Sequence, residues 1–369
     1  MSEGAEAAPA AVILKATADE AAGARLLVAG LPVVERALKQ LGRMPGTRVV
    51  VASDGTLPLP PALPGNATLR PLGGDVPAAL AALQAELGVG AVIIPADVVR
   101  PRARRFDDGL RVVDEPSRRA AEDAVFADLL RGDLGFVARH INKKVSFWLT
   151  RHLLCRLPVT PNQVTLGAGV IGVLGCALIA SGNRAAIVLG FVLAQLQSIL
   201  DGCDGELARV RFQQTAIGEW LDTIVDDALN LLLVGAIGIG VGRLHGTTAP
   251  MLWGLAGCLM LLTYNVIAYR ELVKQGEGGE VLKIRWWWAR GQDFAEVLSD
   301  NRPTSGFNLV VALGKRDFFV FAWLILAIAG QLSIVLAYAV AIAAIYFVVA
   351  VVQLIVRPAP RPRSHERSH

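Results

Sequence analysis

Cysteine is scarce in this sequence, and its spacing excludes two classes of protein. Four cysteines occur among 369 residues, and none of them forms a Cys-x-x-Cys pair. We therefore expect neither a disulfide framework nor a structural zinc site. The chain also contains no nucleic-acid-binding motif. Its basic residues cluster beside apolar runs, which indicates membrane topology and phosphate binding rather than contacts with nucleic acid.

The first residues lack the features of a secretory signal. The stretch MSEGAEAAPA is acidic and rich in alanine, without a basic region followed by an apolar core. We therefore expect the first domain to stay in the cytoplasm. Apolar residues, by contrast, are abundant: 53% of the chain is hydrophobic, and the mean hydropathy is +0.48. This composition indicates a membrane protein with a soluble portion.

Residues 1–130 have the pattern of a small soluble α/β domain. Short runs rich in Val and Ile, which suit buried parallel strands, occur at 11–14, 47–52 and 90–99. The intervening segments 31–42 and 75–88 have the periodicity of helices. The alternation of strand and helix predicts a parallel sheet.

The rest of the chain predicts a polytopic α-helical membrane domain at 159–357. We expect six transmembrane helices, of which the fifth is the shortest, at 162–181, 185–207, 216–241, 249–272, 315–331 and 333–356. Residues 131–158 mix basic and apolar residues at helical spacing, as does a juxtamembrane helix in the membrane interface. The tail at 358–369 is basic, rich in proline and expected to be disordered.

The charges between the spans favour one orientation. Nearly all loop arginines and lysines fall on one side of the predicted membrane. The positive-inside rule places that side, with both termini, in the cytoplasm. We therefore expect a multi-pass integral protein, in the inner membrane of a prokaryote.

The most informative stretch lies at 201–227 and reads DGCDGELARVRFQQTAIGEWLDTIVDD. A carboxylate at bilayer depth costs roughly 2.5–3.5 kcal/mol, so acids between two apolar runs indicate a function. Asp201 and Asp204 are three residues apart, and Asp222 and Asp226 are four apart, so each pair shares one helix face. Two antiparallel helices would join these faces into an oxygen-rich site for Mg²⁺ or Mn²⁺.

The spacing of this stretch is Asp-x2-Asp-Gly-x2-Ala-Arg-x8-Gly-x3-Asp-x3-Asp, with every position filled. On these residues the chain resembles the CDP-alcohol phosphotransferase (CDP-alcohol phosphatidyltransferase) family. The resemblance implies an enzyme that transfers a phosphoryl-alcohol group from a CDP-linked donor to an alcohol and releases CMP. It also implies a homodimer in contact with membrane lipids.

The same resemblance implies roles for individual residues. Asp201, Asp204, Asp222 and Asp226 would bind two divalent ions, which we expect to be Mg²⁺ or Mn²⁺, and Asp226 is also the candidate general base. The groups expected to hold the CDP moiety are Gly205, Ala208, Arg209, Gly218, Asn162 and Thr165. The last two belong to a Pro-Asn-x-x-Thr segment similar to the start of the family's first membrane helix. Alternatively, this segment is only a capped helix start.

Two further features concern the substrates. Lys315 and Arg316 lie where the fifth span begins, and they could bind an anionic acceptor or only mark topology. Residues 28–41 resemble the segment after the phosphate loop of sugar-phosphate nucleotidyltransferases, but the Gly-rich loop is replaced by LKATADEAAGAR. We expect an inactive nucleotidyltransferase-like domain, in which Asp97 is either a metal ligand or a polar residue at a strand end.

The combination of a nucleotidyltransferase-like domain with this membrane domain implies, by resemblance, a role in inositol-phosphate or phospholipid biosynthesis. The favoured acceptor is an inositol phosphate, and the donor is CDP-diacylglycerol or CDP-inositol. Two other classes stay open, a catalytically inert membrane anchor or regulatory module and a six-span transporter. The intact motif argues against the first, and the position of the acids at one membrane edge argues against the second. Metal-dependent release of CMP would separate the enzyme from both.

Overall fold

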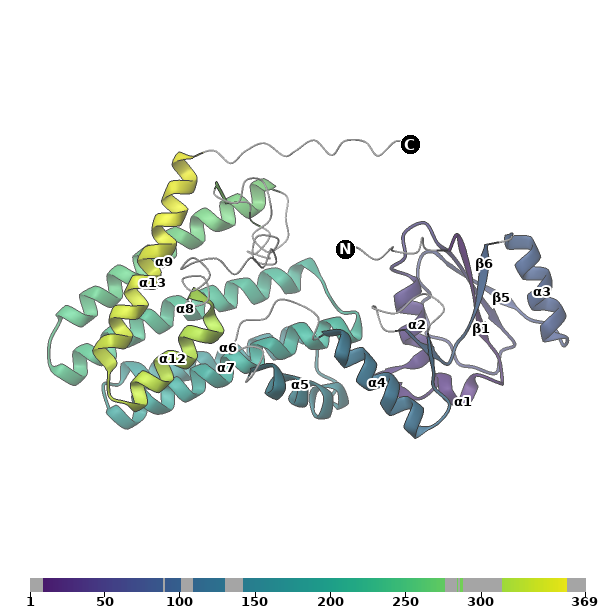
Figure 1. The fold of residues 1–369 in the computed structure, drawn as a ribbon, viewed down its shortest axis with the longest axis horizontal. Coiled ribbons are helices and arrows are strands. Elements are labelled where there is room, and N and C mark those ends of the chain that lie inside the picture. The colour runs from purple at the N-terminus through teal and green to yellow at the C-terminus, as the bar shows by residue number, and fades with distance from the viewer. Residues whose placement is uncertain are drawn as a thin grey trace, which may run out of the picture. The chain divides into compact units, whose positions relative to one another are not determined.

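A computed structural model describes residues 9–88, 90–100, 109–129, 142–275, 284, 286–287 and 314–356. The chain divides into two compact units (Figure 1). One comprises Met1–Gly132, Arg151–Pro158 and Ala208–Gln213, and the other comprises Asp133–Thr150, Val159–Leu207 and Gln214–His369. The predicted tail at 358–369 lies outside the described residues.

The first unit is built on a four-stranded parallel sheet in the order β5-β4-β1-β6. Its strands are β1 (Ala11–Ala16), β4 (Arg48–Ser53), β5 (Ala67–Pro71) and β6 (Ala91–Pro95). Four short strands form two antiparallel pairs, β2 (Leu27–Val28) with β3 (Leu31–Pro32) and β7 (Val98–Val99) with β8 (Leu110–Arg111). The helices are α1 (Ala21–Ala24), α2 (Val33–Leu41), α3 (Val76–Leu87) and α4 (Glu115–Leu129).

The alternation of side chains along β1 produces two cores, one on each face of the sheet. Val12 and Leu14 pack with residues of α2, whereas Ile13 packs with Leu80 and Leu83 of α3. Successive side chains of a strand point to opposite faces, so a strand covered on both sides must be apolar throughout. Figure 1 shows α2 and α3 on opposite sides of the sheet. The predicted parallel α/β domain is confirmed.

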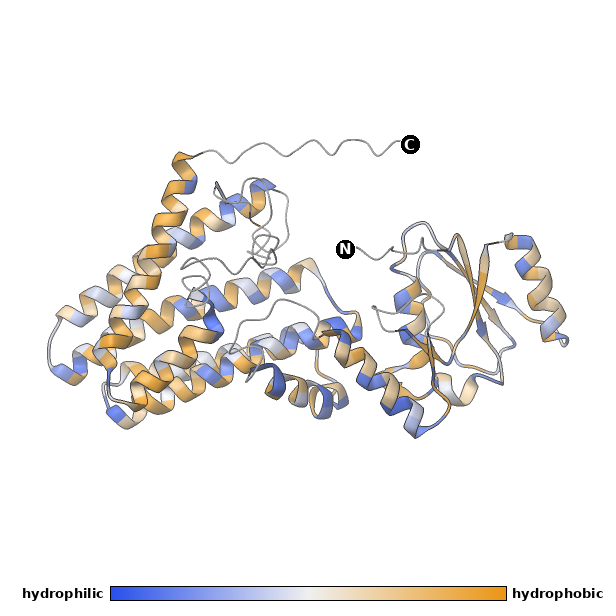
Figure 2. Ribbon diagram, in the orientation of Figure 1, coloured by the Kyte–Doolittle hydropathy of each residue, from blue (hydrophilic) through white to orange (hydrophobic). Residues whose placement is uncertain are grey.

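Among the described residues, five helices are long and apolar enough to cross a membrane, and they lie almost wholly in the second unit. They are α6 (Pro161–Ala180), α7 (Arg184–Arg211), α8 (Ala216–His245), α9 (Ala249–Gln275) and α13 (Leu332–Ile355). Figure 2 shows hydrophobic residues along most of their length. Helix α6 starts as its sequence predicts, because the Thr160 side chain and Gln163 form a reciprocal capping box and Pro161 takes the first position. The protein is an integral membrane protein.

The prediction of six spans is not confirmed. The expected fifth span corresponds to α12 (Arg316–Ile328), which has 13 residues. At 1.5 Å per residue such a helix rises about 20 Å, which is shorter than the roughly 30 Å hydrocarbon core of a bilayer. Its side chains Phe319, Val320 and Trp323 nevertheless join the core of the bundle.

Within the segment predicted as a juxtamembrane helix, the structure describes α5 (Lys143–His152) and a 3₁₀ turn (Leu154–Arg156), whereas residues 131–141 lie outside the described residues. Trp148 is 61% exposed and Val145 is 41% exposed, as suits a helix in the membrane interface. The small polar side chains Ser146 and Thr150 are buried instead. The helix therefore presents its apolar residues outward and packs inward through polar ones.

Glycines allow the membrane helices to approach each other closely. A Cβ added to Gly238 of α8 would lie 2.7 Å from Gly254 Cα and 2.8 Å from the Pro250 carbonyl oxygen, both of α9. Close backbone contact of this kind supplies much of the packing energy between helices in lipid. We expect Gly238→Ala to separate α8 from α9 and to destabilise the protein by about 1–3 kcal/mol, because overpacking forces the backbone to shift.

Gly167→Ala in α6 is the matched control, since an added Cβ there meets no atom within 4 Å. Alanine at this position should be neutral or slightly stabilising, because it favours the helix. Thermal unfolding in detergent compares the two variants. Equal midpoints for both would contradict the packing argument.

Candidate active site

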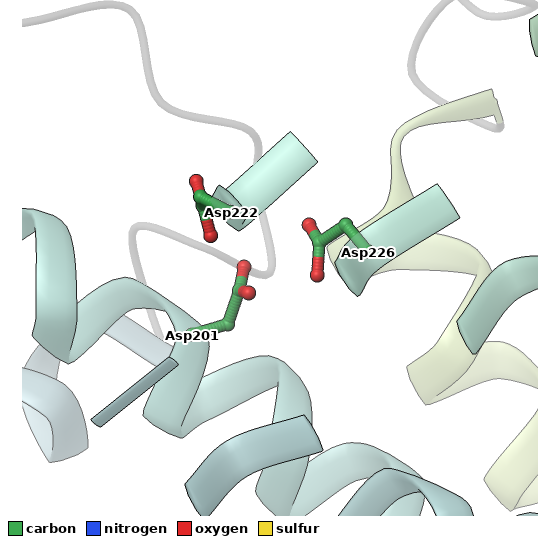
Figure 3. A group of neighbouring side chains, drawn as sticks. All are labelled: Asp201, Asp222 and Asp226. Carbon is green, nitrogen blue, oxygen red and sulfur yellow. The ribbon is translucent and has the colours of Figure 1, made fainter. Parts of the chain in front are cut away.

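Three predicted carboxylates converge in the second unit. Asp201 lies on α7, and Asp222 and Asp226 lie one helical turn apart on α8. One oxygen from each carboxylate can be chosen so that all three lie within 4.8 Å of one another. Figure 3 shows the three side chains pointing toward a common centre. The expected convergence of the two acidic faces therefore occurs for these three residues.

Asp204 is held slightly apart from this cluster. It is 5% exposed, and its Oδ2 accepts a hydrogen bond from the hydroxyl of Thr165 on α6. Asn162, on the same helix, is also close to the site, because a Cβ added to Gly218 would lie 3.1 Å from Asn162 Oδ1. The structure thus brings together four of the residues predicted to bind metal or CDP. Their roles stay predictions.

Arg316 is the cation that faces the carboxylates. Its Nη1 is ion-paired with Asp226 Oδ1 and lies 3.8 Å from Asp201 Oδ2, and its Nη2 donates a hydrogen bond of 2.7 Å to Gln197 Oε1. Lys315 caps the start of α12 and makes no ion pair among the described residues. The two basic residues that the sequence groups together therefore lie in different environments.

The remaining residues expected to bind CDP lie near the end of α7. The backbone N–H of Gly205 donates to Asp204 Oδ1. Ala208 and Arg209 follow on the last turns of the same helix, in a segment that groups with the first unit. Their part in CDP binding stays a prediction.

The cluster has the chemistry of a divalent-metal site. Within the part of the chain that the structure describes, the cluster of three carboxylates contacts one guanidinium, that of Arg316, and negative charge is in excess there. Asp222 Oδ1 is buried and accepts no hydrogen bond from any described residue. A buried acceptor without a donor is unfavourable unless a ligand satisfies it. Carboxylate oxygens are the ligands that Mg²⁺ and Mn²⁺ prefer, so Asp201, Asp222 and Asp226 fit such an ion.

Comparison with known families agrees with this geometry. The model of the CDP-alcohol phosphatidyltransferase family matches residues 158–352, more than half of the chain. The chain belongs to the CDP-alcohol phosphatidyltransferase family. Membership makes the protein an enzyme of the transferase class, and the match covers the whole acidic stretch together with α12 and most of α13.

Several curated proteins resemble parts of this phosphatidyltransferase. The chain is 37% identical to one from Rubrobacter xylanophilus over 150 residues, which is 40% of this chain and 33% of that protein. It is 27% identical to one from Aquifex aeolicus over 201 residues, which is 54% of this chain and 39% of the other. A third, from Thermococcus kodakarensis, is 30% identical over 168 residues, covering 44% and 36%.

Each of these relatives is named "Bifunctional IPC transferase and DIPP synthase". The matched part spans between one third and two fifths of their length. The name therefore describes those longer proteins, and the substrates of this chain need an argument of their own.

Glu206 is a residue of the acidic stretch that sequence reasoning missed. It is fully buried, although it lies only two residues beyond Asp204. Its carboxylate accepts hydrogen bonds from three side chains of α5, which are Lys143 Nζ at 2.9 Å, Ser146 Oγ at 2.6 Å and Thr150 Oγ1 at 2.8 Å. Glu206 lies about 140° around α7 from Asp201, so it holds α5 against the side of α7 that faces away from Asp201. The Ser-x3-Thr spacing of α5 was the available signal.

We expect Glu206→Ala to destabilise the protein by about 3 kcal/mol. Removing one partner of a buried ion pair leaves the other without its counter-charge. This estimate is at the lower end of the usual range because Lys143 is 15% exposed and can reach water. CMP release should fall as well, since α7 loses its support. Thermal unfolding and CMP release measure the two effects.

Glu219→Ala is the control for this prediction. Glu219 is exposed in the first turn of α8, so its loss should change stability by less than about 1 kcal/mol. Similar effects for both variants would show that the three hydrogen bonds of Glu206 contribute little.

Two aromatic residues of the second unit make contacts near the site. Trp286 is 3% exposed and stacks on Tyr264 with ring centroids 6.0 Å apart. Asp227 accepts a hydrogen bond of 2.6 Å from the hydroxyl of Tyr269. Its carboxylate is thereby held by α9, outside the cluster of three.

Proposed function

We propose that the protein catalyses the divalent-metal-dependent transfer of a phosphoryl-alcohol group from a CDP-linked donor to an alcohol acceptor, with release of CMP. The observation that carries the proposal is the convergence of Asp201, Asp222 and Asp226 in a chain of this family. The favoured acceptor is an inositol phosphate, which places the reaction in inositol-phosphate or phospholipid biosynthesis.

The residues of the cluster have distinct tasks in this reaction. The three carboxylates would hold the divalent ions, and such ions would neutralise the charge of the pyrophosphate. Asp226 accepts the proton of the acceptor hydroxyl. The acceptor oxygen forms a bond to the phosphorus that carries the donor's alcohol, and the bond from that phosphorus to the bridging oxygen breaks. CMP leaves with the bridging oxygen. Asn162, Thr165, Gly205 and Gly218 line the CDP side, with Ala208 and Arg209.

The acceptor site lies where α12 begins. A guanidinium can bind a phosphate through two parallel hydrogen bonds, and Arg316 lies beside Asp226. Lys315 adds a second cation at the same helix start. An acceptor that carries its own phosphate suits this pair better than a neutral alcohol does.

The site faces the cytoplasm in this proposal. Arginines and lysines concentrate on that side of the spans, and the acids lie at the same edge. Both termini, the nucleotide and the acceptor are then in one compartment, at the inner membrane of a prokaryote. Assembly as a homodimer belongs to the same proposal.

A donor and acceptor matrix tests the substrates. Purified protein with Mg²⁺ is given CDP-diacylglycerol or CDP-inositol, each with and without inositol 1-phosphate, and CMP is measured. We expect CMP with only one donor and only when the acceptor is present. An equal rate of CMP formation with and without inositol 1-phosphate would contradict the acceptor assignment. No CMP with any pair would favour the inert-anchor alternative.

A further inference from the structure

The parallel sheet of the first unit has one place suited to a nucleotide. The strand order is β5-β4-β1-β6. From β1 the chain adds β4 and β5 on one side of β1 and then returns to add β6 on the other side, so the direction of strand addition reverses at β1. In open parallel sheets, ligands bind at such a reversal, outside the carboxyl ends of the two strands. Phosphates are held there by backbone N–H groups of the loop that follows the first strand. We call this place, at the carboxyl ends of β1 and β6, the switch crevice.

The chain's own carboxylates occupy the N–H groups that follow β1. Thr17 donates through its backbone N–H to Glu20 Oε2 at 3.1 Å and through its hydroxyl at 2.6 Å. Ala18 donates its backbone N–H to Asp54 Oδ2 at 3.0 Å. Glu20 is 1% exposed, so this arrangement is part of the packed domain. Two donors that could bind phosphate are thus already satisfied by anions.

The basic residues of the switch crevice are likewise engaged. Lys15 Nζ lies 2.8 Å from Glu20 Oε1, and Arg111 Nε donates to Asp97 Oδ2 at 2.9 Å. Asp97, at the end of β6, is 1% exposed, and burial raises the pKa of its carboxyl. Lys15 Nζ also lies 3.4 Å from Asp19 Oδ2, so four carboxylates (Asp19, Glu20, Asp54 and Asp97) lie beside these two cations or the N–H groups after β1. A triphosphate would meet repulsion here rather than a counter-charge.

We propose that the switch crevice is closed to nucleoside triphosphates and that this protein does not make its own CDP-linked donor. A separate nucleotidyltransferase must then supply the CDP-linked donor. This inference rests on the donor named in the proposed function. In the nucleotidyltransferase reaction a phosphate oxygen of an alcohol phosphate forms a bond to the α-phosphorus of CTP. The bond between this phosphorus and the β-phosphate oxygen breaks, and pyrophosphate leaves. The curated relatives are named as bifunctional, whereas on this proposal the first unit of this chain has no nucleotidyltransferase activity.

Pyrophosphate release tests the proposal on the full-length protein. The protein is incubated with CTP, inositol 1-phosphate and Mg²⁺, and pyrophosphate is measured with a coupled enzyme assay. We expect no pyrophosphate above the protein-free rate. The same preparation should release CMP when CDP-inositol or CDP-diacylglycerol is supplied. Pyrophosphate formation from CTP above the protein-free rate would overturn the proposal.

The two proposals fail in distinguishable ways. If no supplied donor leads to CMP release, the transferase function is contradicted. Pyrophosphate formation from CTP is measured independently and still decides whether the switch crevice is closed. Hydrogen exchange on the same preparation shows whether the amides of β1 and β4 are protected, that is, whether the first unit is folded. If they are protected, the absence of pyrophosphate formation from CTP supports a closed switch crevice. Addition of a separate cytidylyltransferase should then permit CMP release from CTP.

Direct binding of CTP provides a second measurement. The Asp222→Asn variant, chosen to weaken nucleotide binding at the carboxylate cluster, is titrated with CTP in a calorimeter. We expect any saturable binding that remains to be unchanged when Asp97→Ala is added. Saturable binding that disappears when Asp97→Ala is added would place CTP in the switch crevice and contradict its closure.

Discussion

Asp226→Asn is expected to reduce CMP release by at least roughly 10³-fold, because general-base catalysis alone contributes roughly 10²–10⁴-fold. The variant removes a negative charge from a cluster whose oxygens approach within 4.8 Å. It also removes the oxygen that we propose as the acceptor of the hydroxyl proton. Binding of the CDP donor should remain detectable, since Asp201 and Asp222 are intact. CMP release and calorimetric donor binding measure the two properties separately.

Asp227→Asn is the matched control, since it makes the same substitution one position later on α8. The asparagine can still accept the hydrogen bond of 2.6 Å from Tyr269. The side chain lies outside the cluster, so CMP release should stay within about tenfold of the unmodified protein, a change of about 1.4 kcal/mol in barrier. If Asp226→Asn turned over at near-normal rate, the base assignment would be wrong.

Arg316→Ala is expected to reduce CMP release by roughly 10²-fold or more, because truncating a buried charged partner costs roughly 2–5 kcal/mol. Arg316 contacts Asp226, Asp201 and Gln197, so it joins α12 to the two helices that carry the cluster. If it also binds the acceptor's phosphate, the KM for inositol phosphate should rise more than the KM for the donor. Steady-state kinetics with each substrate varied in turn measures this difference.

Lys315→Ala distinguishes a site residue from a general effect of basic charge. Lys315 precedes Arg316 but makes no ion pair among the described residues. We expect a smaller loss, within about tenfold. Equal losses for both variants would indicate that the two cations act only through the local field, and the specific assignment of Arg316 would be wrong.

Much of the site followed from spacing alone. Asp222 and Asp226 are four residues apart on a helix, so they had to share a face, and the intact motif indicated that Asp201 would meet them. The strands at 11–14, 47–52 and 90–99 were equally visible, because strands buried on both faces form continuous apolar runs. The edge strand β5 was missed, since four of its five residues are exposed and its sequence ATLRP has no apolar pattern.

The remaining features depend on which helix faces which, and a single sequence does not contain that information. In the sequence, nothing distinguishes Glu206 from other charged residues. Its role is visible only in the structure, where Ser146 and Thr150 of α5 donate hydrogen bonds to its carboxylate. Trp286 belonged to an aromatic run typical of a membrane interface, but it is buried against Tyr264. The fifth span was inferred from hydropathy, whereas the helix described there has 13 residues. Each of these outcomes was decided by tertiary packing rather than by local pattern.

The most direct test of the central claim is metal-dependent CMP release by the purified protein. The donor and acceptor that react are incubated with Mg²⁺, then with excess EDTA, and then with Mg²⁺ restored. We predict that CMP formation stops with EDTA and returns with Mg²⁺, and that Asp222→Asn forms no CMP in any condition. CMP formation that continues at the same rate in EDTA, or that is unchanged in Asp222→Asn, would contradict the claim that these carboxylates hold the catalytic ions.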